Sequence, residues 1–449
     1  MSSTSNNQGR VREASRLEQL FRPLDRLFET QAASGVVLLI AAILAFVWAN
    51  SPWASSYSSL WETQIDIAIG GDYGISKSLV HWINDGLMTL FFVVVGLEIK
   101  REVLVGEISS LRRAAFPLAA ALGGAIVPAA IFLSLNWGQP TSTGWGIPLA
   151  TDIAFVLGIL ALLRSRIPPS FKVLVTAAAI VDDILAILII AFFYTEQLRL
   201  TYLGLATVLM ALLIAVNLLR VNRPVIYALL GVGLWLALSK SGVHATLAGV
   251  LLAMATPARA RVISESFIQR GLDRLRDLDE PVDLDSSVLV DENRRAALRD
   301  LDSITQRAQS PMIRMEEALD PWVAYLIVPL FALANAGVQI DSGVGEIVTS
   351  TLGLGVILGL VAGKQIGIMA AAFLVTRLGL AELPERVTWR HIYGMAWLGG
   401  IGFTVSLFIT DLAFDSSDNL TMAKIGILTA SVIAACGGYL VLRTANGAD

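Results

Sequence analysis

Long apolar segments recur along this chain and limit what it can fold into. Most are about as long as the roughly 20 residues that a helix needs to cross a bilayer. The 449 residues are 55% hydrophobic and only 16% charged, which leaves few polar side chains to cover a soluble domain. We therefore predict an all-α, polytopic membrane protein with about 12 transmembrane helices. The segments are 32–51, 80–99, 114–135, 145–164, 171–194, 201–219, 224–239, 243–255, 318–338, 351–376, 391–413 and 422–443.

Basic side chains mark alternate connections between these segments. Arginine and lysine gather in connections such as the one with Arg112 and Arg113, and they are scarce in intervening ones such as "DLAFDSSDNLT". Because cytoplasmic loops of membrane proteins carry the excess of basic residues, both termini are expected in the cytoplasm. The net charge of only −4 gives no indication of a nucleic-acid partner.

The segments outside the apolar runs set the organisation of the chain. Residues 1–30 form a cytoplasmic segment whose leucines and phenylalanines at helical spacing predict a helix on the membrane surface, with a frayed tail as the alternative. In the first external connection, alternating isoleucines before Gly70 and Gly71 predict a β-hairpin near 63–79. The expected parts are thus 1–30, spans one to eight in 31–256, a long charged cytoplasmic loop at 257–316, spans nine to twelve in 317–443, and a cytoplasmic tail at 444–449.

Two adjacent aspartates, Asp182 and Asp183, lie within the apolar run "AAAIVDDILAILIIAFF". A charge at the bilayer centre costs roughly 2.5–3.5 kcal/mol on insertion scales, so such groups usually mark a transport path. Neighbours on a helix point about 100° apart, so one carboxylate can face a partner helix while the other faces a cavity. The alternative is that both are neutral or hydrogen-bonded packing groups.

A lysine in the tenth span is the natural partner of this pair. Gly355, Gly359, Gly363 and Gly367 recur every fourth residue and let a neighbouring helix approach closely. Lys364 lies beside this glycine stripe, where a lone ammonium would be costly. We therefore expect it to pair with Asp182 or Asp183, and the sequence leaves the choice open.

The fourth and eleventh spans contain helix-breaking residues. The fourth has Pro148, Thr151 and Asp152 in mid-run, and the eleventh contains the glycine-rich stretch "GGIG" beginning at Gly399. Unwound backbone at membrane depth is tolerated only inside protein or beside a watery cavity. We expect these two interrupted helices to cross, with Asp152 compensating the positive helix N-ends and Lys364 the negative C-ends.

Six motifs, taken together, resemble the NhaA family of bacterial sodium/proton antiporters. They are "FFVVVGLEIKRE", "PLATDIAFVLGILALL", "AIVDDILAI", "SGVHATLAG", "DPWVAYLIVPLFALANAGV" and "GGIGFTVSLFI". The resemblance implies a fold with inverted-topology repeats and two broken helices. The family is itself a standard example of that topology, so this expectation is not independent of the resemblance. It also implies electrogenic, pH-regulated exchange of sodium or lithium for protons by alternating access, in the bacterial inner membrane. A homodimer through hairpin 63–79, contact with membrane lipid and no cofactor complete the expectation.

The resemblance also implies roles for individual residues. The implied site for the cation and protons comprises Asp182, Asp183, Lys364, Thr151 and Asp152, with Asp183 and Asp182 holding the transported sodium ion. A cytoplasmic funnel and pH response are implied for Asp85, Glu98, Arg101, Glu102, His244, Glu316 and Glu317. The sequence departs from the family at Glu317 and Asp320, where histidines are usual, and in its longer loop before them. The pH set point is therefore left open.

Two other functions compete with exchange. An intramembrane aspartyl protease also needs two membrane aspartates, but they must face each other from separate helices and share a proton. Asp182 and Asp183 are neighbours on one helix, so a transporter rather than an enzyme is expected. A passive channel is the second alternative; it would let sodium pass without moving protons in return.

Overall fold

The structure is a computed structural model that describes residues 32–68, 74–163, 166–195, 198–221, 223–258, 298–299, 309–340, 345 and 349–445. Helices dominate the described residues, and two strands form the only sheet among them. The all-α, polytopic fold class is thereby confirmed. The proposed segment 1–30 and most of the loop 257–316 lie outside the described residues.

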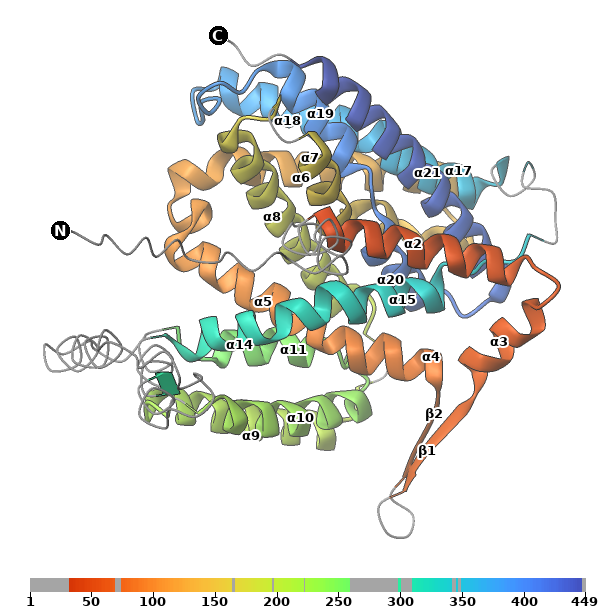
Figure 1. Cartoon of the computed structure of the whole chain (residues 1–449), viewed down its shortest axis with the longest axis vertical. Coiled ribbons are helices and arrows are strands. Elements are labelled where there is room, and N and C mark those ends of the chain that lie inside the picture. Colours follow the sequence, from red (N-terminus) through yellow and green to blue (C-terminus); the bar gives the residue numbers. More distant parts are fainter. Residues whose placement is uncertain are drawn as a thin grey trace, which may run out of the picture.

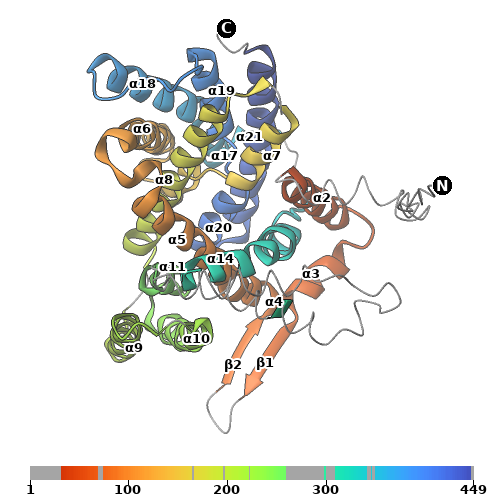
Figure 2. The same ribbon diagram turned by 60° about the vertical axis from the view of Figure 1, so that its left-hand side comes forward.

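The helices form two groups that meet along one side (Figure 1, Figure 2). The first group packs around α5, against which α11 and α14 lie, with α9 and α10 beyond them. Its bounds are α5 Met88–Val105, α9 Leu200–Leu218, α10 Pro224–Ser241, α11 Leu247–Ala255, α14 Pro311–Trp322 and α15 Val328–Asn335. α2, at Ala32–Ala49, lies against α15 of this group and α7 of the other.

The second group packs around α6, which contacts α8, α17 and α18. α21 lies against α17, α19 and α20. The bounds are α6 Leu111–Asn136, α7 Ile153–Leu163, α8 Pro169–Phe193, α17 Thr351–Leu358, α18 Lys364–Arg377, α19 Trp389–Gly399, α20 Phe403–Ala413 and α21 Ser417–Thr444. A 3-10 helix, Pro140–Leu149, precedes α7.

One end of the bundle carries a hairpin. After α2 the chain bends by 113° into the short helix α3, Ala54–Glu62, and then forms β1, Gln64–Ala68, and β2, Gly74–Ser78. The strands are antiparallel, with Ile65 opposite Lys77, as the alternating isoleucines predict. The hairpin projects from the helices (Figure 1). We call this end of the molecule the hairpin end; α5 starts near it and ends at the opposite end.

Three helices contain a single π-helical turn. These turns are Trp82–Leu87, between the short helix α4, Leu79–His81, and α5; Val323–Ile327, between α14 and α15; and Gly359–Gly363, between α17 and α18. Each π-helical turn joins its two helices without a loop, so each pair of helices forms one long continuous helix. π turns of this kind are frequent at functional sites.

The glycine stripe lies against α6, as expected. A side chain at Gly363 would meet Pro128, and one at Gly367 would meet the carbonyl of Gly123. The backbone of α6 and that of the helix with the glycine stripe therefore touch directly. This contact holds Lys364 beside α6.

The count of twelve spans is not confirmed. Among the described residues, eight helices are long and apolar enough to cross a membrane, or ten if each of two bent pairs counts as one span. The eighth predicted segment is helical only over the nine residues of α11. The second, 80–99, lies on a helix that continues beyond it through a charged stretch from Glu98 to Glu102. The inverted repeats stay a prediction.

A candidate cation site where two interrupted helices meet

Both expected interruptions are present, and hydrogen bonds join them. The 3-10 helix ends at Leu149 and α7 starts at Ile153, whereas α19 ends at Gly399 and α20 starts at Phe403 with a bend of 40°. The backbone N–H of Asp152 donates to the carbonyl of Ile401 at 2.7 Å. Unpaired backbone groups of one break are thus satisfied by the other, which is what an interruption at membrane depth requires.

Asp152 binds the N-terminal turns of two helices at once. Its Oδ1 accepts from the backbone N–H of Phe155 in α7 at 3.2 Å. Its Oδ2 accepts from the backbone N–H of Thr404 in α20 at 3.1 Å and from the Thr404 hydroxyl at 2.5 Å. A carboxylate suits the partial positive charge of helix N-termini. The expectation that Asp152 compensates the N-ends is confirmed.

Lys364 pairs with Asp182 rather than with Asp183. Its Nζ lies 2.7 Å from Oδ2 of Asp182 and 3.1 Å from Oγ1 of Thr151, and its side chain is fully buried. The expected partnership with one of the two carboxylates is therefore confirmed, and the structure makes the choice that the sequence left open.

Thr151 connects this ion pair to the break in the eleventh span. Its hydroxyl lies 2.7 Å from Oδ2 of Asp182 and 2.9 Å from the carbonyl of Gly399, the last residue of α19. A hydroxyl has one proton to donate, so it serves one of these acceptors at a time while accepting from Lys364. Lys364 reaches the negative end of α19 through Thr151, not directly.

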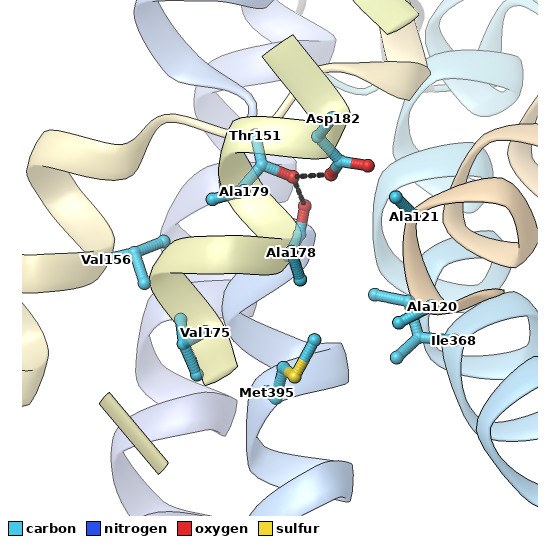
Figure 3. A pocket seen from close by; sticks show the side chains of 11 residues that line it. Ala120, Ala121, Thr151, Val156, Val175, Ala178, Ala179, Asp182, Ile368 and Met395 are labelled. Atoms are coloured by element: carbon cyan, nitrogen blue, oxygen red, sulfur yellow. Dashed lines mark hydrogen bonds between the residues drawn. The ribbon is translucent and has the colours of Figure 1, made fainter. Parts of the chain in front are cut away.

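The other oxygen of Asp182 is buried and has no hydrogen-bond partner among the described residues. In Figure 3 it points away from Thr151. Beside it lies a cavity of about 20 Å³, lined by residues of α6, α8 and α19, among them Ala121, Ala178 and Met395. A cavity of this size holds about one water molecule or one small ion. A charged acceptor next to such a space can bind a cation or a proton.

Asp183 is 7% exposed, and in the described chain it makes neither a hydrogen bond nor an ion pair. The two aspartates therefore differ as their angular separation predicts: one is held by Lys364 and the other is free to bind. Among the described residues, no group of three or more His, Cys, Asp or Glu side chains could hold a resident metal ion.

Comparison with known proteins identifies the family. The model of the family described as Na+/H+ antiporter 1 matches residues 25–442. The chain belongs to this family. Two relatives named Na(+)/H(+) antiporter NhaA are each 47% identical: one from Oleidesulfovibrio alaskensis over 427 residues, 95% of both chains, and one from Koribacter versatilis over 443 residues, 98% of this chain and 95% of that one. The solved structure of the sodium proton antiporter MjNhaP1 from Methanocaldococcus jannaschii aligns with 96% of this chain and 100% of that chain at 14% identity, with a TM-score of 0.44, too low to support an inference.

Three of the seven residues expected in the NhaA-like funnel are joined by ion pairs. Glu102 and Glu317 lie close enough to interact electrostatically with Glu98 and Glu316, respectively. Arg101 contacts Glu316 of α14 at 2.5 Å and lies 3.7 Å from Glu98. This cluster is at the end of the bundle opposite the hairpin. Glu102 instead accepts from the backbone N–H of Glu107 at 3.0 Å, which closes the turn after α5.

Two further expected residues of this funnel lie at the other end of the bundle, whereas Glu317 lies beside the cluster. Asp85 pairs with Lys77 of β2 at 3.0 Å and with His81 at 2.7 Å, at the hairpin end, so the prediction that it joins the funnel is wrong. His244 contacts the carbonyl of Tyr194, also at the hairpin end. Glu317 accepts from Gln309 at 3.2 Å.

One residue that forms part of the joint was missed. Thr404 supplies both a backbone and a hydroxyl donor to Asp152, and its position two residues after Gly402, at the start of a new helix, was the available signal. The carbonyls of Gly399 and Ile401 have no signal in a sequence, because every residue has one.

Proposed function

We propose that the chain exchanges sodium or lithium for protons across the bacterial inner membrane by alternating access. The observation that carries this proposal is the unequal state of two buried carboxylates. Asp182 has one oxygen paired with Lys364 and the other turned to a cavity, while Asp183 has no partner among the described residues. A stable packing role would leave neither acceptor unused, because unsatisfied buried polar groups are rare.

The same carboxylates would hold protons or a cation, but not both. A bound proton removes the negative charge that attracts sodium, so one ligand displaces the other. The ammonium group of Lys364 can form an ion pair with Asp182 when the transported cation is absent. Exchange of unequal charge would make the cycle electrogenic.

The surrounding residues have distinct proposed roles. Asp152 and Thr151 hold the two interruptions together, and the cluster of Glu98, Arg101 and Glu316 is the proposed site of the pH response. We place both termini in the cytoplasm because basic-rich and basic-poor connections alternate along the sequence. The projecting hairpin supports a homodimer formed through residues 63–79.

The two competing functions fit the site less well. Asp182 and Asp183 diverge and Asp182 is bound to an ammonium group, so they cannot share a proton as protease aspartates do. A channel would need no proton-binding group linked to its cation site.

The test is sodium-driven proton flux in proteoliposomes that contain the full chain. Asp183→Asn should insert and fold but show no exchange, while Asp415→Asn, which changes an exposed carboxylate in the connection after α20, should exchange normally. Full exchange in the Asp183→Asn protein would contradict the site. Sodium flux without proton counterflow in the unmodified protein would establish a channel instead.

A further inference from the structure

The helix that follows the eleventh-span break carries three contact residues on one face. Thr404 binds Asp152 at the break, Phe408 is one turn further, and Asp411 is another turn beyond, near the hairpin end. Residues three and four apart lie on the same side of a helix. This face of α20 therefore runs from the candidate site to the surface at the hairpin end.

Phe408 forms an aromatic layer with the other group of helices. Its ring is 1% exposed and lies 5.4 Å from the ring of Phe92 in α5 and 6.3 Å from that of Phe331 in α15, centroid to centroid. Water and ions cannot pass such a contact without separating the rings.

A polar layer follows one turn closer to the surface. Asn84 donates to Oδ2 of Asp411 at 2.9 Å, and Asn84 and Asn335 exchange hydrogen bonds at 2.8 Å and 3.3 Å. Lys424 of α21 lies 2.9 Å from Oδ1 of Asp411. Of these contacts, only the bond between Asn84 and Asp411 crosses from one group of helices to the other.

This arrangement lets the two sides part without leaving a charge unpaired. Asp411 keeps Lys424, because α20 and α21 belong to the same group, and Asn84 keeps Asn335 on the other side. The cavity beside Asp182, in contrast, is lined by Val175, Ala178 and Ala179, which lie in the half of α8 farther from the hairpin end. The candidate site is therefore displaced toward the opposite end of the bundle. The aromatic layer and the polar layer both lie between it and the hairpin end.

We propose that Phe92, Phe331, Phe408, Asn84, Asn335 and Asp411 form a hairpin-end gate, which opens when α20 moves away from α5 and α15. The proposal rests on alternating access as the proposed function. It assigns the opening step to the rupture of one hydrogen bond and two aromatic contacts. The ion pair between Asp411 and Lys424 and the hydrogen bonds between Asn84 and Asn335 stay intact.

Cross-linking tests whether the gate must open during exchange. In a Cys436→Ser background, which removes the single cysteine of the chain, Asn84→Cys and Asp411→Cys are joined by a short bis-methanethiosulfonate reagent, which forms a reducible disulfide bond with each thiol. Cross-linking should slow exchange at least tenfold, and reduction of the link should restore it. The matched control joins Asn84→Cys to Asn335→Cys, which lie on the same side of the gate, and there the cross-link should not slow exchange relative to the same double variant before cross-linking. Exchange at the full rate across the Asn84–Asp411 link would overturn the gate.

Accessibility gives a second readout that does not depend on transport. Val405 is 5% exposed and lies one turn inside Phe408 on the same face, so Val405→Cys reports entry past the gate. Adding Asn84→Ala should raise labelling by a membrane-impermeant thiol reagent from the hairpin side several-fold. Thr410→Val, whose lost hydroxyl bonds only to Ser406 in its own helix, should not. Equal labelling in the two variants would contradict the gate. If labelling behaves as expected but the unmodified protein exchanges no ions, the proposed function fails and the gate stands.

Discussion

Asp152 and Thr404 are 252 residues apart in the chain, yet two hydrogen bonds from Thr404 end on one oxygen of Asp152. The second oxygen accepts from the backbone of α7. One carboxylate therefore fixes the distance between two helix starts, and any movement of either half-helix is transmitted to the other.

Asp152→Asn should destabilise the protein and reduce exchange. An asparagine side chain has one acceptor oxygen and an NH₂ group that can only donate, so one helix start would face a donor instead of an acceptor. A buried donor left unpaired costs about 1–3 kcal/mol. Thermal unfolding in detergent measures the loss. Thr404→Val, which removes the hydroxyl bond but keeps the backbone bond, should lose less; an equal loss would mean that the backbone bond contributes little.

Lys364→Met should lower the melting temperature, because it leaves the buried carboxylate of Asp182 without its cation. Breaking a buried charged pair typically costs about 3–5 kcal/mol, and the loss should be smaller here because Asp182 can take up a proton. Adding Asp182→Asn to Lys364→Met should recover part of the stability. A loss in the double variant that equals or exceeds the sum of the two single losses would show that the two side chains are not partners.

The apparent KM for sodium should rise as the pH falls. Competition between sodium and protons at one site raises the KM by about tenfold per pH unit for each displaced proton. The maximal rate at saturating sodium should change far less. Initial rates over a sodium series at pH values from about 6 to 9 provide the measurement. A KM independent of pH, with a varying maximal rate, would mean that the pH response comes from other groups than the two aspartates. The cluster of Glu98, Arg101 and Glu316 would then be the better candidate.

Gly367→Ala should destabilise the protein even though it adds a single methyl group. That methyl would meet the backbone carbonyl of Gly123, and neither backbone can move without separating the two helices. Overpacking of this kind typically costs about 1–3 kcal/mol. Gly204→Ala, on α9 with open space around it, is the matched control and should leave the melting temperature unchanged or slightly higher. Similar losses in both variants would mean that the contact with Gly123 is not the cause, because alanine favours the helix more than glycine does and cannot itself lower stability.

Much of the candidate site could be predicted from the sequence because charges in an apolar run are costly and few. That scarcity, together with the glycine stripe beside Lys364, led to Lys364, Asp182 and Asp183 as a group, and the breaks led to Asp152. The choice of Asp182 over Asp183 could not be predicted, since it depends on how α8 is rotated about its axis. Hydropathy indicates how deep a residue lies in the membrane but not which way its side chain points from the helix axis.

The errors have equally physical causes. Asp85 begins the segment that follows the hairpin, so the order of segments already puts it at the hairpin end; grouping it with the funnel followed the resemblance instead. The span count differs for two reasons. α11 is shorter than its apolar run, whose first residues form the turn around His244. α5 contains the charged residues from Glu98 to Glu102. The hairpin-end contacts of Asn84 with Asp411 join helices that are distant in sequence, and no local pattern predicts them.

The π turn at Gly359–Gly363 keeps the four glycines of the stripe on one side of their helix. On a regular α-helix, four residues turn through about 400°, so a stripe with a repeat of four drifts by about 40° at each step and by about 120° over three steps. Gly367 would then face well away from the direction of Gly355. The wider π turn rotates each residue through a smaller angle, and it lies at the middle step of the stripe, where it cancels drift. All four glycines therefore keep contact with α6 or with the 3-10 helix before α7. Deleting one residue from this turn would keep the helix intact but rotate α18 about the helix axis relative to α17. Lys364 and the first glycines of the stripe could then no longer both face their partners.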